Sequence, residues 1–239
     1  MDSAYVPVHA EEDREHWWFR GRLAVILAVL DRRLPRRRLR LVELGCGSGG
    51  VLAALGRYGE TIGVEVDDVL RGIAVARGLN VLAGALPDRL PVDPGSADVV
   101  LLLDVLEHLE ADQAALEAAR KLLAPGGLLV VTVPAYRWLW SAHDVVLGHR
   151  RRYTRAELRG LVTRAGFTLD RVTYFNTLLL PAIAAARLAR RLEGRKGHDL
   201  QRPRTALNSV LTRVFAAERH AVSRVDLPFG GSVLLLARA

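Results

Sequence analysis

The sequence contains very little cysteine and very little lysine. Cys46 is the single cysteine of the 239 residues, which excludes an intrachain disulfide and a zinc site built from several thiolates. Lys121 and Lys196 are the only lysines among 34 basic residues, so the net charge of +8 comes almost entirely from arginine. We interpret this charge mainly as compositional bias on a solvated surface. Three clusters still offer charge to an anionic partner such as phosphate, nucleic acid or lipid headgroups: Arg32–Arg40, Arg150–Arg155 and Arg187–Arg204.

Long hydrophobic runs are also missing. The longest one, Leu178–Ala186, has nine residues and ends at Arg187, whereas a membrane-spanning helix needs about 20. The first twenty residues carry several acidic side chains and no apolar run, so we expect no signal peptide. With half of its residues hydrophobic and a quarter charged, the chain has the composition of a globular protein. We expect a cytoplasmic protein, with peripheral membrane contact through residues 178–204 as an open alternative.

Short apolar runs alternate with segments of helical periodicity between residues 39 and 133. Uniformly apolar runs predict strands buried on both faces, and strand–helix–strand order with short connections predicts right-handed crossovers in a parallel sheet. We therefore expect an α/β fold. The expected strands are Leu39–Leu44, Thr61–Val66, Asn80–Ala83, Ala97–Leu103, Gly127–Val133, Phe167–Phe175 and Ser232–Ala237. The expected helices between them are Gly49–Tyr58, Asp67–Ala76 and Ala111–Leu123.

Three further segments lie outside this range. Residues 134–153 show no regular periodicity, and ordered loops of such length are often functional. Thr154 and Glu157 then form a capping box, which predicts the start of a helix that ends near Gly166. Residues 181–226 are rich in Ala, Leu and Arg and predict a helical insertion before the last strand.

A glycine-rich loop follows the first predicted strand. Gly45, Gly47 and Gly49 allow tight turns and let a ligand approach the backbone, because no Cβ stands in the way. One strand later, Glu65 ends the run Gly63-Val-Glu, where a carboxylate can accept both hydroxyl hydrogens of a ribose. This arrangement predicts a nucleoside-type cofactor at the carboxyl edge of an open sheet. Gly45, Gly47 and Gly50 also satisfy the dinucleotide fingerprint, so an NAD-dependent oxidoreductase is an alternative.

Four motifs in order resemble the class I S-adenosylmethionine-dependent methyltransferases, and the core resembles the quinone-biosynthesis O-methyltransferases among them. The motifs are Val42–Gly49, Gly63–Glu65, Ala97–His108 and Leu122–Val130. The resemblance implies a Rossmann-like, doubly wound, seven-stranded and mostly parallel sheet with helices on both faces. It also implies an N-terminal cap at 1–38 and a cofactor-binding domain at 39–239, with an acceptor loop at 134–153 and the insertion at 181–226. A short-chain dehydrogenase would need Tyr-x-x-x-Lys, which neither lysine completes.

The resemblance assigns S-adenosylmethionine as methyl donor and places its parts on the chain. Glu43 is expected near the amino-acid part, the glycines below it, and Glu65 on the ribose. Many relatives carry Asp where Ala85 stands, so Asp88 or a backbone carbonyl is expected to hold the adenine instead. The cofactor-binding residues predicted in this way are Glu43, Gly45, Cys46, Gly47, Gly49, Glu65, Leu86 and Leu103.

Methyl transfer requires alignment of the acceptor and, for hydroxyl acceptors, a base. Our catalytic candidates are His149, His108 and Asp104, and of the two histidines in the 134–153 loop, His143 and His149, we prefer the second. Some similar O-methyltransferases place metal-binding side chains at the positions of Asp104, Glu107 and His108. The same Leu-Glu-His stretch is common in relatives that use no metal, and we expect none here.

The acceptor itself is not specified by these motifs. Aromatic residues at Trp17-Trp18 and within 134–153 favour a pocket for a flat or apolar acceptor, or else attach these segments to the domain. We expect O- or N-methylation of a small-molecule or lipid- or glycan-linked acceptor. The alternatives are an RNA- or DNA-directed methyltransferase, which the missing Asn/Asp-Pro-Pro-Tyr motif disfavours, and a non-catalytic partner subunit. The insertion is compatible with a homodimer contact, with packing on the sheet or with a membrane surface.

Overall fold

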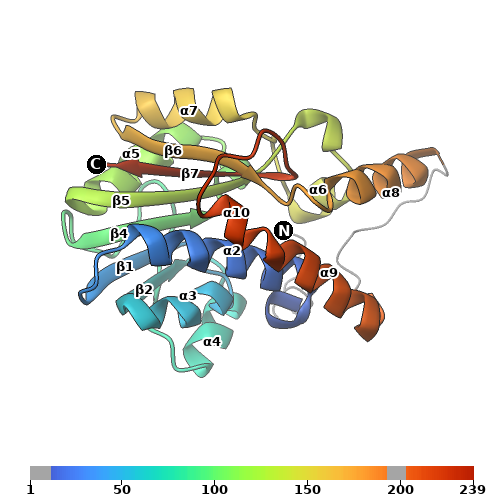
Figure 1. The fold of residues 1–239 in the computed structure, drawn as a ribbon. Coiled ribbons are helices and arrows are strands. Elements are labelled where there is room, and N and C mark those ends of the chain that lie inside the picture. Colours follow the sequence, from blue (N-terminus) through green and yellow to red (C-terminus); the bar gives the residue numbers. More distant parts are fainter. Residues whose placement is uncertain (1–11, 193–202) are drawn as a thin grey trace. The chain divides into compact units, whose positions relative to one another are not determined.

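The computed structural model describes residues 12–192 and 203–239 (Figure 1). The first part of the predicted N-terminal cap and residues 193–202, which belong to the predicted insertion and to the stretch 178–204, lie outside the described residues. The chain forms two compact units. One contains the described residues up to Leu34, with Pro134–Thr154 and Thr173–Val233, and the other contains Pro35–Val133, Arg155–Val172 and Leu234–Ala239.

All seven predicted strands are present in one mixed, mostly parallel sheet of order β3-β2-β1-β4-β5-β7-β6. Two of them have the predicted bounds, and the others differ by a few residues at their ends. The strands are β1 (Leu39–Leu44), β2 (Gly59–Glu65), β3 (Val81–Ala83), β4 (Ala97–Leu103), β5 (Leu123–Pro134), β6 (Thr168–Phe175) and β7 (Ser232–Arg238). The strands form because most of their side chains are apolar and pack in the core: Leu41, Val100 and Leu129 are all fully buried.

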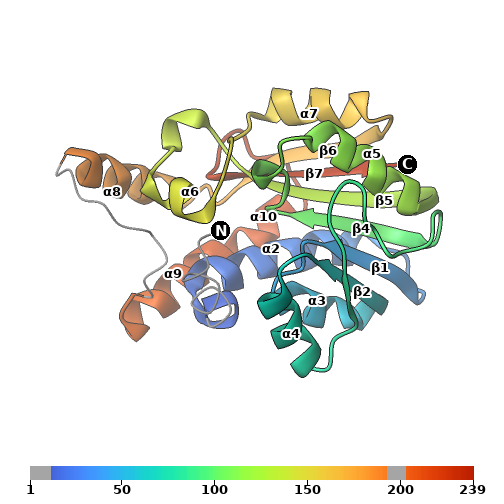
Figure 2. The same cartoon turned by 180° about the vertical axis from the view of Figure 1, so that it is seen from behind.

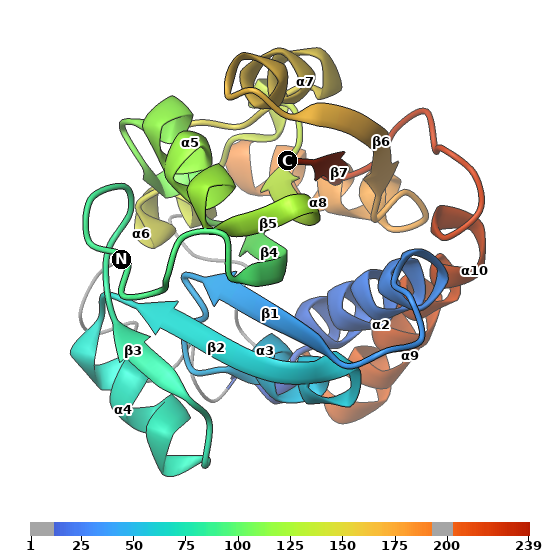
Figure 3. The same cartoon turned by 90° about the vertical axis from the view of Figure 1, so that its left-hand side faces the viewer.

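The strand order reverses direction at β1, which pairs in parallel with β2 on one side and with β4 on the other. Because crossovers between parallel strands are right-handed, α3 and α4 lie on one face and α5 and α7 on the opposite face (Figure 3). These helices are α3 (Gly50–Leu55, continued by η2, Gly56–Tyr58), α4 (Asp68–Ala76), α5 (Asp112–Leu122) and α7 (Arg155–Arg164). The predicted left-handed residue after α7, Gly166, has φ +85°.

The unit that contains the described residues up to Leu34 is largely helical. Helices α2 (Trp17–Arg33) and α9 (Thr205–Ala217) lie side by side (Figures 1 and 2), and α10 (Arg219–Val222) follows directly. The side chain of Asn208 connects the first two, since it accepts from the Trp17 amide at 2.9 Å and donates to the Glu15 carbonyl at 2.9 Å. The Trp17 ring contacts Phe215, which is fully buried. At least this tryptophan therefore attaches the N-terminal segment to the domain.

The expectation that residues 134–153 lack regular structure is wrong. The segment contains η4 (Arg137–Leu139) and α6 (Ala142–Leu147). Helix α6 begins with a capping box, in which Ser141 and Asp144 satisfy each other's exposed amides. A helix of six residues is too short to produce a clear hydrophobic period, and this explains why the pattern concealed it.

Helix α8 (Leu180–Leu192) presents an exposed, uncharged face. The exposed residues of this face are Pro181, Ala182, Ala185, Ala186, Leu188 and Ala189. Leu179 and Leu180 at its start are buried, and Arg187 donates from Nη1 to the Leu139 carbonyl of η4 at 2.6 Å. Among the described helices, none is long and apolar enough to cross a membrane. The face is thus a surface feature and not part of the protein core.

Candidate functional site

The glycine loop begins where β1 ends. The amides of Gly45 and Cys46 donate to the carbonyl of Val64 on the neighbouring strand, at 2.8 and 3.3 Å, and this turns the chain over the sheet edge. Gly47 has φ +55°, and within residues 12–192 and 203–239, its two chain neighbours aside, no heavy atom lies within 4 Å of the position that a Cβ would take there. Gly49 has φ +84° and caps α3, and a Cβ there would approach the Leu79 Cδ1 atom to 2.2 Å. Gly47 therefore leaves an open cradle, whereas a side chain at Gly49 would be strained by the left-handed backbone and would displace the Leu79 side chain.

Glu65 holds this loop in place from the end of β2. Its Oε2 atom accepts from the Gly47 amide at 2.8 Å, and Oε1 accepts from the amides of Val66 and Asp67 at 2.9 Å each. The side chain is 7% exposed. A carboxylate has about four acceptor positions, so these three bonds leave capacity for a ribose hydroxyl. Glu65, which is predicted to bind the ribose, thus also organises the loop that is predicted to contact the rest of the cofactor.

Cys46 lies within the loop, and the environment of its thiol makes it unreactive. Burial raises the pKa of its thiol far above the ordinary value, and the charges of Glu43 and Glu65 raise it further. Reactive cysteines have a lowered pKa, so this thiol is unsuited to nucleophilic chemistry. Glu43 itself is buried at 3% exposure on β1. The predicted set from Glu43 to Gly49, together with Glu65, is therefore brought together at one sheet edge.

The predicted adenine region is a tight turn after β3. The Ala85 amide donates to the Arg89 carbonyl at 2.8 Å and the Arg89 amide returns a bond to the Ala85 carbonyl at 2.9 Å. Leu86, followed by a cis peptide bond to Pro87, lies within this turn, and Asp88 is exposed on it. The methyl side chain of Ala85 cannot accept a hydrogen bond, so adenine recognition by Asp88 or a backbone carbonyl stays a prediction.

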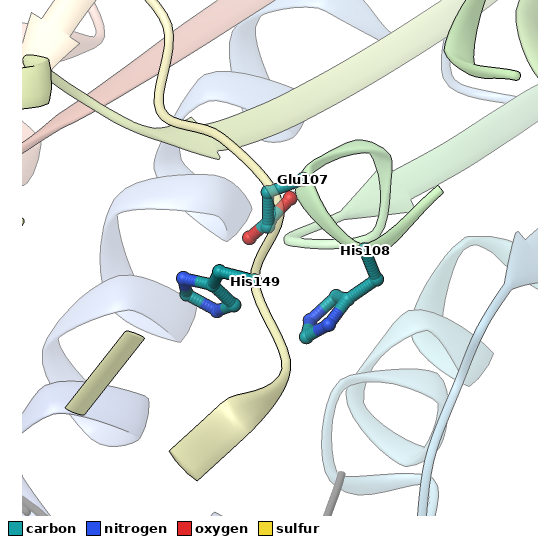
Figure 4. A group of neighbouring side chains, drawn as sticks. All are labelled: Glu107, His108 and His149. Atoms are coloured by element: carbon teal, nitrogen blue, oxygen red, sulfur yellow. The ribbon is translucent and has the colours of Figure 1, made fainter. Parts of the chain in front are cut away.

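The end of β4 carries two of the catalytic candidates. Asp104 has φ +58°, its amide donates to the Thr132 carbonyl at 2.9 Å, and its Oδ2 accepts from the Thr132 hydroxyl at 3.2 Å. Leu103 before it is buried. His108 lies four residues later on the short turn η3 (Leu106–His108), beside the fully buried Glu107 (Figure 4). No sequence motif singles out Thr132, which anchors Asp104 from the neighbouring strand.

His149, the third candidate, lies on the segment that follows α6 (Figure 4). Its Nδ1 atom is 2.8 Å from Oδ1 of Asp144, which is fully buried. Burial alone would raise the pKa of Asp144, but the hydrogen bond with His149 and the charge of Arg152 hold it well below its usual range. Asp104 and His108 belong to one compact unit and His149 to the other, so their joint action stays a proposal.

The residues at the sheet edge fit S-adenosylmethionine. The open cradle over Gly47 admits a ligand against the backbone, and the Glu65 carboxylate suits a ribose diol. Glu43 supplies negative charge near the position expected for the amino group of the methionine part. Gly47, Glu65 and Glu43 would therefore hold the cofactor.

Comparison with known proteins agrees with this geometry. A family model described as a methyltransferase domain matches residues 12–172, more than half of the chain. A probable S-adenosylmethionine-dependent methyltransferase from Mycolicibacterium smegmatis is 31% identical over 163 residues, which cover 65% of this chain and 61% of that protein. A ubiquinone biosynthesis O-methyltransferase from Cereibacter sphaeroides is 37% identical over 108 residues, 42% of this chain and 43% of that protein. The chain thus spans less than two thirds of the length of these relatives.

The fold also has solved counterparts. A methyltransferase structure from Thermotoga maritima, described as dependent on S-adenosylmethionine, superposes with a TM-score of 0.61 at 20% identity and covers 100% of this chain and 99% of that one. This likeness shows the fold alone. Together with the family match, which includes the glycine loop and Glu65, it leads to one conclusion: the chain belongs to the S-adenosylmethionine-dependent methyltransferases.

Proposed function

We propose that this protein transfers the methyl group of S-adenosylmethionine to an oxygen or nitrogen atom of a small-molecule or lipid- or glycan-linked acceptor. The observation that carries the proposal is the open cradle over Gly47 beside the Glu65 carboxylate. Bound S-adenosylmethionine supplies a methyl group that is already attached to its leaving group, so the protein mainly aligns the acceptor and excludes water.

Calorimetric titration with S-adenosylhomocysteine tests the cofactor part of this proposal. We expect micromolar binding, and no binding of NADH in a parallel titration. A radiolabelled methyl-transfer screen over phenols, amines and lipid-linked glycans then identifies the acceptor. If S-adenosylhomocysteine does not bind to folded protein, the proposed activity is wrong.

We assign the proton-accepting role to His149, with Asp104 and His108 as residues that contact the reacting groups from the end of β4. The role of His149 as the base is supported by the environment of its side chain, which is only 7% exposed and is held by the buried carboxylate of Asp144. For a hydroxyl acceptor, His149→Ala is expected to lower kcat by roughly 100-fold. An unchanged kcat with the identified acceptor would exclude this role.

A flat or apolar acceptor is supported by a ladder of three aromatic rings. The Tyr136 ring stacks on Tyr174 at a centroid distance of 5.2 Å and on Trp138 at 5.7 Å. Trp138 at the end of the ladder is 59% exposed, and Tyr136 has φ +56°, a conformation that costs roughly 1–3 kcal/mol and is typical of binding sites. An exposed indole that is already stacked loses little freedom when a further ring packs on it.

Trp138→Ala tests this ladder. The variant is expected to raise KM for the acceptor by about 10-fold, with the affinity for S-adenosylhomocysteine unchanged, because one aromatic stacking contact contributes about 0.5–1.5 kcal/mol beyond buried area. Val145→Ala, which shortens another exposed apolar side chain (65% exposed), is the matched control. Equal KM values for both variants would remove the ladder from acceptor binding.

We also propose that the exposed face of α8 contacts an anionic lipid surface. Among the side chains of this face that the structure describes, none is charged, and Leu188 is 56% exposed; Leu178, two residues before the helix, is 58% exposed. The sequence of the helix also includes arginine, which suits phosphate headgroups. Co-sedimentation with phosphatidylglycerol vesicles, but not with phosphatidylcholine vesicles, is expected, and Leu188→Glu should abolish it. Failure to sediment, together with a dimer in analytical ultracentrifugation that Leu188→Glu disrupts, would instead identify a homodimer contact.

A further inference from the structure

The carboxylate of Asp144 is the centre of a buried polar cluster. Its Oδ1 atom is 2.8 Å from Nδ1 of His149 and accepts from Nε of Arg152 at 2.8 Å. Its Oδ2 atom accepts from Nη2 of Arg152 at 3.1 Å and from the amide of Ser141 at 2.8 Å. The exposed fractions are 0% for Asp144 and 4% for Arg152. All members belong to one compact unit, so the cluster is defined by that unit alone.

This arrangement determines which ring nitrogen of His149 carries hydrogen. The Arg152 guanidinium and the Ser141 amide keep the Asp144 carboxylate ionised, and an ionised carboxylate only accepts hydrogen bonds. Nδ1 of His149 must therefore carry the hydrogen in the 2.8 Å contact. The remaining nitrogen, Nε2, is then the ring atom whose lone pair can accept a proton from an acceptor group.

We propose that Asp144 is a positioning residue, which makes Nε2 of His149 the basic atom of the active site and stabilises the imidazolium that forms there. The proposal rests on the proposed function, in which His149 accepts a proton. With a hydroxyl acceptor, the proton leaves the O–H group for Nε2, and the electron pair of that bond stays on the oxygen atom. This pair forms the bond to the methyl carbon, the C–S pair remains on sulfur, and the imidazolium then returns its proton to water.

Asp144 also caps α6, and a purely structural role would be limited to that. The capping box, however, uses Oδ2, whereas the contact to His149 is made by Oδ1. Arg152 bonds to both oxygens and additionally to the Ala135 carbonyl at 2.9 Å, which fixes the orientation of the carboxylate. The cluster therefore determines the position of the imidazole as well as the start of the helix.

The first test is long-range nitrogen–proton correlation NMR of protein labelled at histidine, near pH 8, with His149→Gln used to assign the signals. We expect wild-type His149 to be in the Nδ1–H tautomer, with Nε2 unprotonated. An Nε2–H tautomer would overturn the proposal, even if variants at Asp144 fail to fold. This measurement needs no acceptor, so it is independent of whether the proposed methyl transfer is correct.

The second test uses the acceptor found by the screen. Asp144→Asn is expected to lower kcat by at least 10-fold with little change in KM for S-adenosylmethionine, and His149→Ala with Asp144→Asn should lose no more than His149→Ala alone. Asp98→Asn, which alters the ion pair of Asp98 with Arg37, is the control and should leave kcat unchanged. If the effects of the two single variants multiply, Asp144 does not act through His149. If His149→Ala is fully active, the base role fails while the tautomer result still stands.

Discussion

Replacement of Glu65 by Gln is the sharpest test of the cofactor site. The carboxylate makes three bonds to backbone amides, and a bound ribose would add at least one more. A glutamine side chain has a single carbonyl oxygen, so it can serve the Oε1 side or the Oε2 side but not both. Its amide nitrogen would then face an N–H group of the glycine loop or would fail to accept from a ribose hydroxyl.

The expected loss follows from the number of bonds. A hydrogen bond to a charged group contributes about 1.5–3 kcal/mol, and Glu65→Gln removes at least one of them. Because 1.4 kcal/mol corresponds to a factor of ten, the Kd for S-adenosylhomocysteine should rise roughly 10- to 150-fold. The variant should still fold, since the strand and the glycine loop keep their remaining backbone bonds.

Calorimetric titration with S-adenosylhomocysteine measures this change. Glu60→Gln is the matched control, because Glu60 lies on the same strand but its side chain is 59% exposed. The control should bind within about twofold of the wild type, since exposed ion pairs contribute less than about 1 kcal/mol. A Glu65→Gln protein that unfolds like the wild type and binds within threefold of it would refute the reasoning.

Three further outcomes are expected. Gly49→Ala should lower the free energy of unfolding by about 2–4 kcal/mol in urea, because the new methyl group adds a clash to a left-handed backbone. Gly47→Ala should cost only about 1–2 kcal/mol of stability but weaken S-adenosylhomocysteine binding more than tenfold, and equal binding would show that the cradle is not the cofactor site. The pKa of the Asp144 carboxyl is lowered in the fold, so its stabilisation is present above its unfolded pKa of about 4 and is lost as pH falls. The difference in unfolding free energy between wild type and Asp144→Asn should therefore shrink from pH 6 to pH 3. The control Asp68→Asn, at a side chain that is 85% exposed, should stay within about 1 kcal/mol of the wild type at each pH.

The amino-acid sequence by itself determined the sheet and the cofactor loop. Strands β1 and β4 have the predicted bounds because most of their side chains are apolar and buried, a local pattern that is typical of a strand covered on both faces. The place of Gly47 and Gly49 between a predicted strand and a predicted helix indicated a tight turn, which is a local problem of backbone conformation, and their role toward the cofactor came from the family resemblance.

Other features depend on residues that are distant in the sequence. The exposed face of α8 has the same composition as a helix packed in a core, and only the tertiary structure shows that this face is uncovered. The Ser141–Asp144 capping box could have been found from its spacing, but the contacts of Asp144 with His149 and Arg152 arise only when the segment folds back on itself. Hydrophobic periodicity reports burial along one element. The orientation of a buried charge depends on which donors surround it in space, and that information is present only in the folded chain.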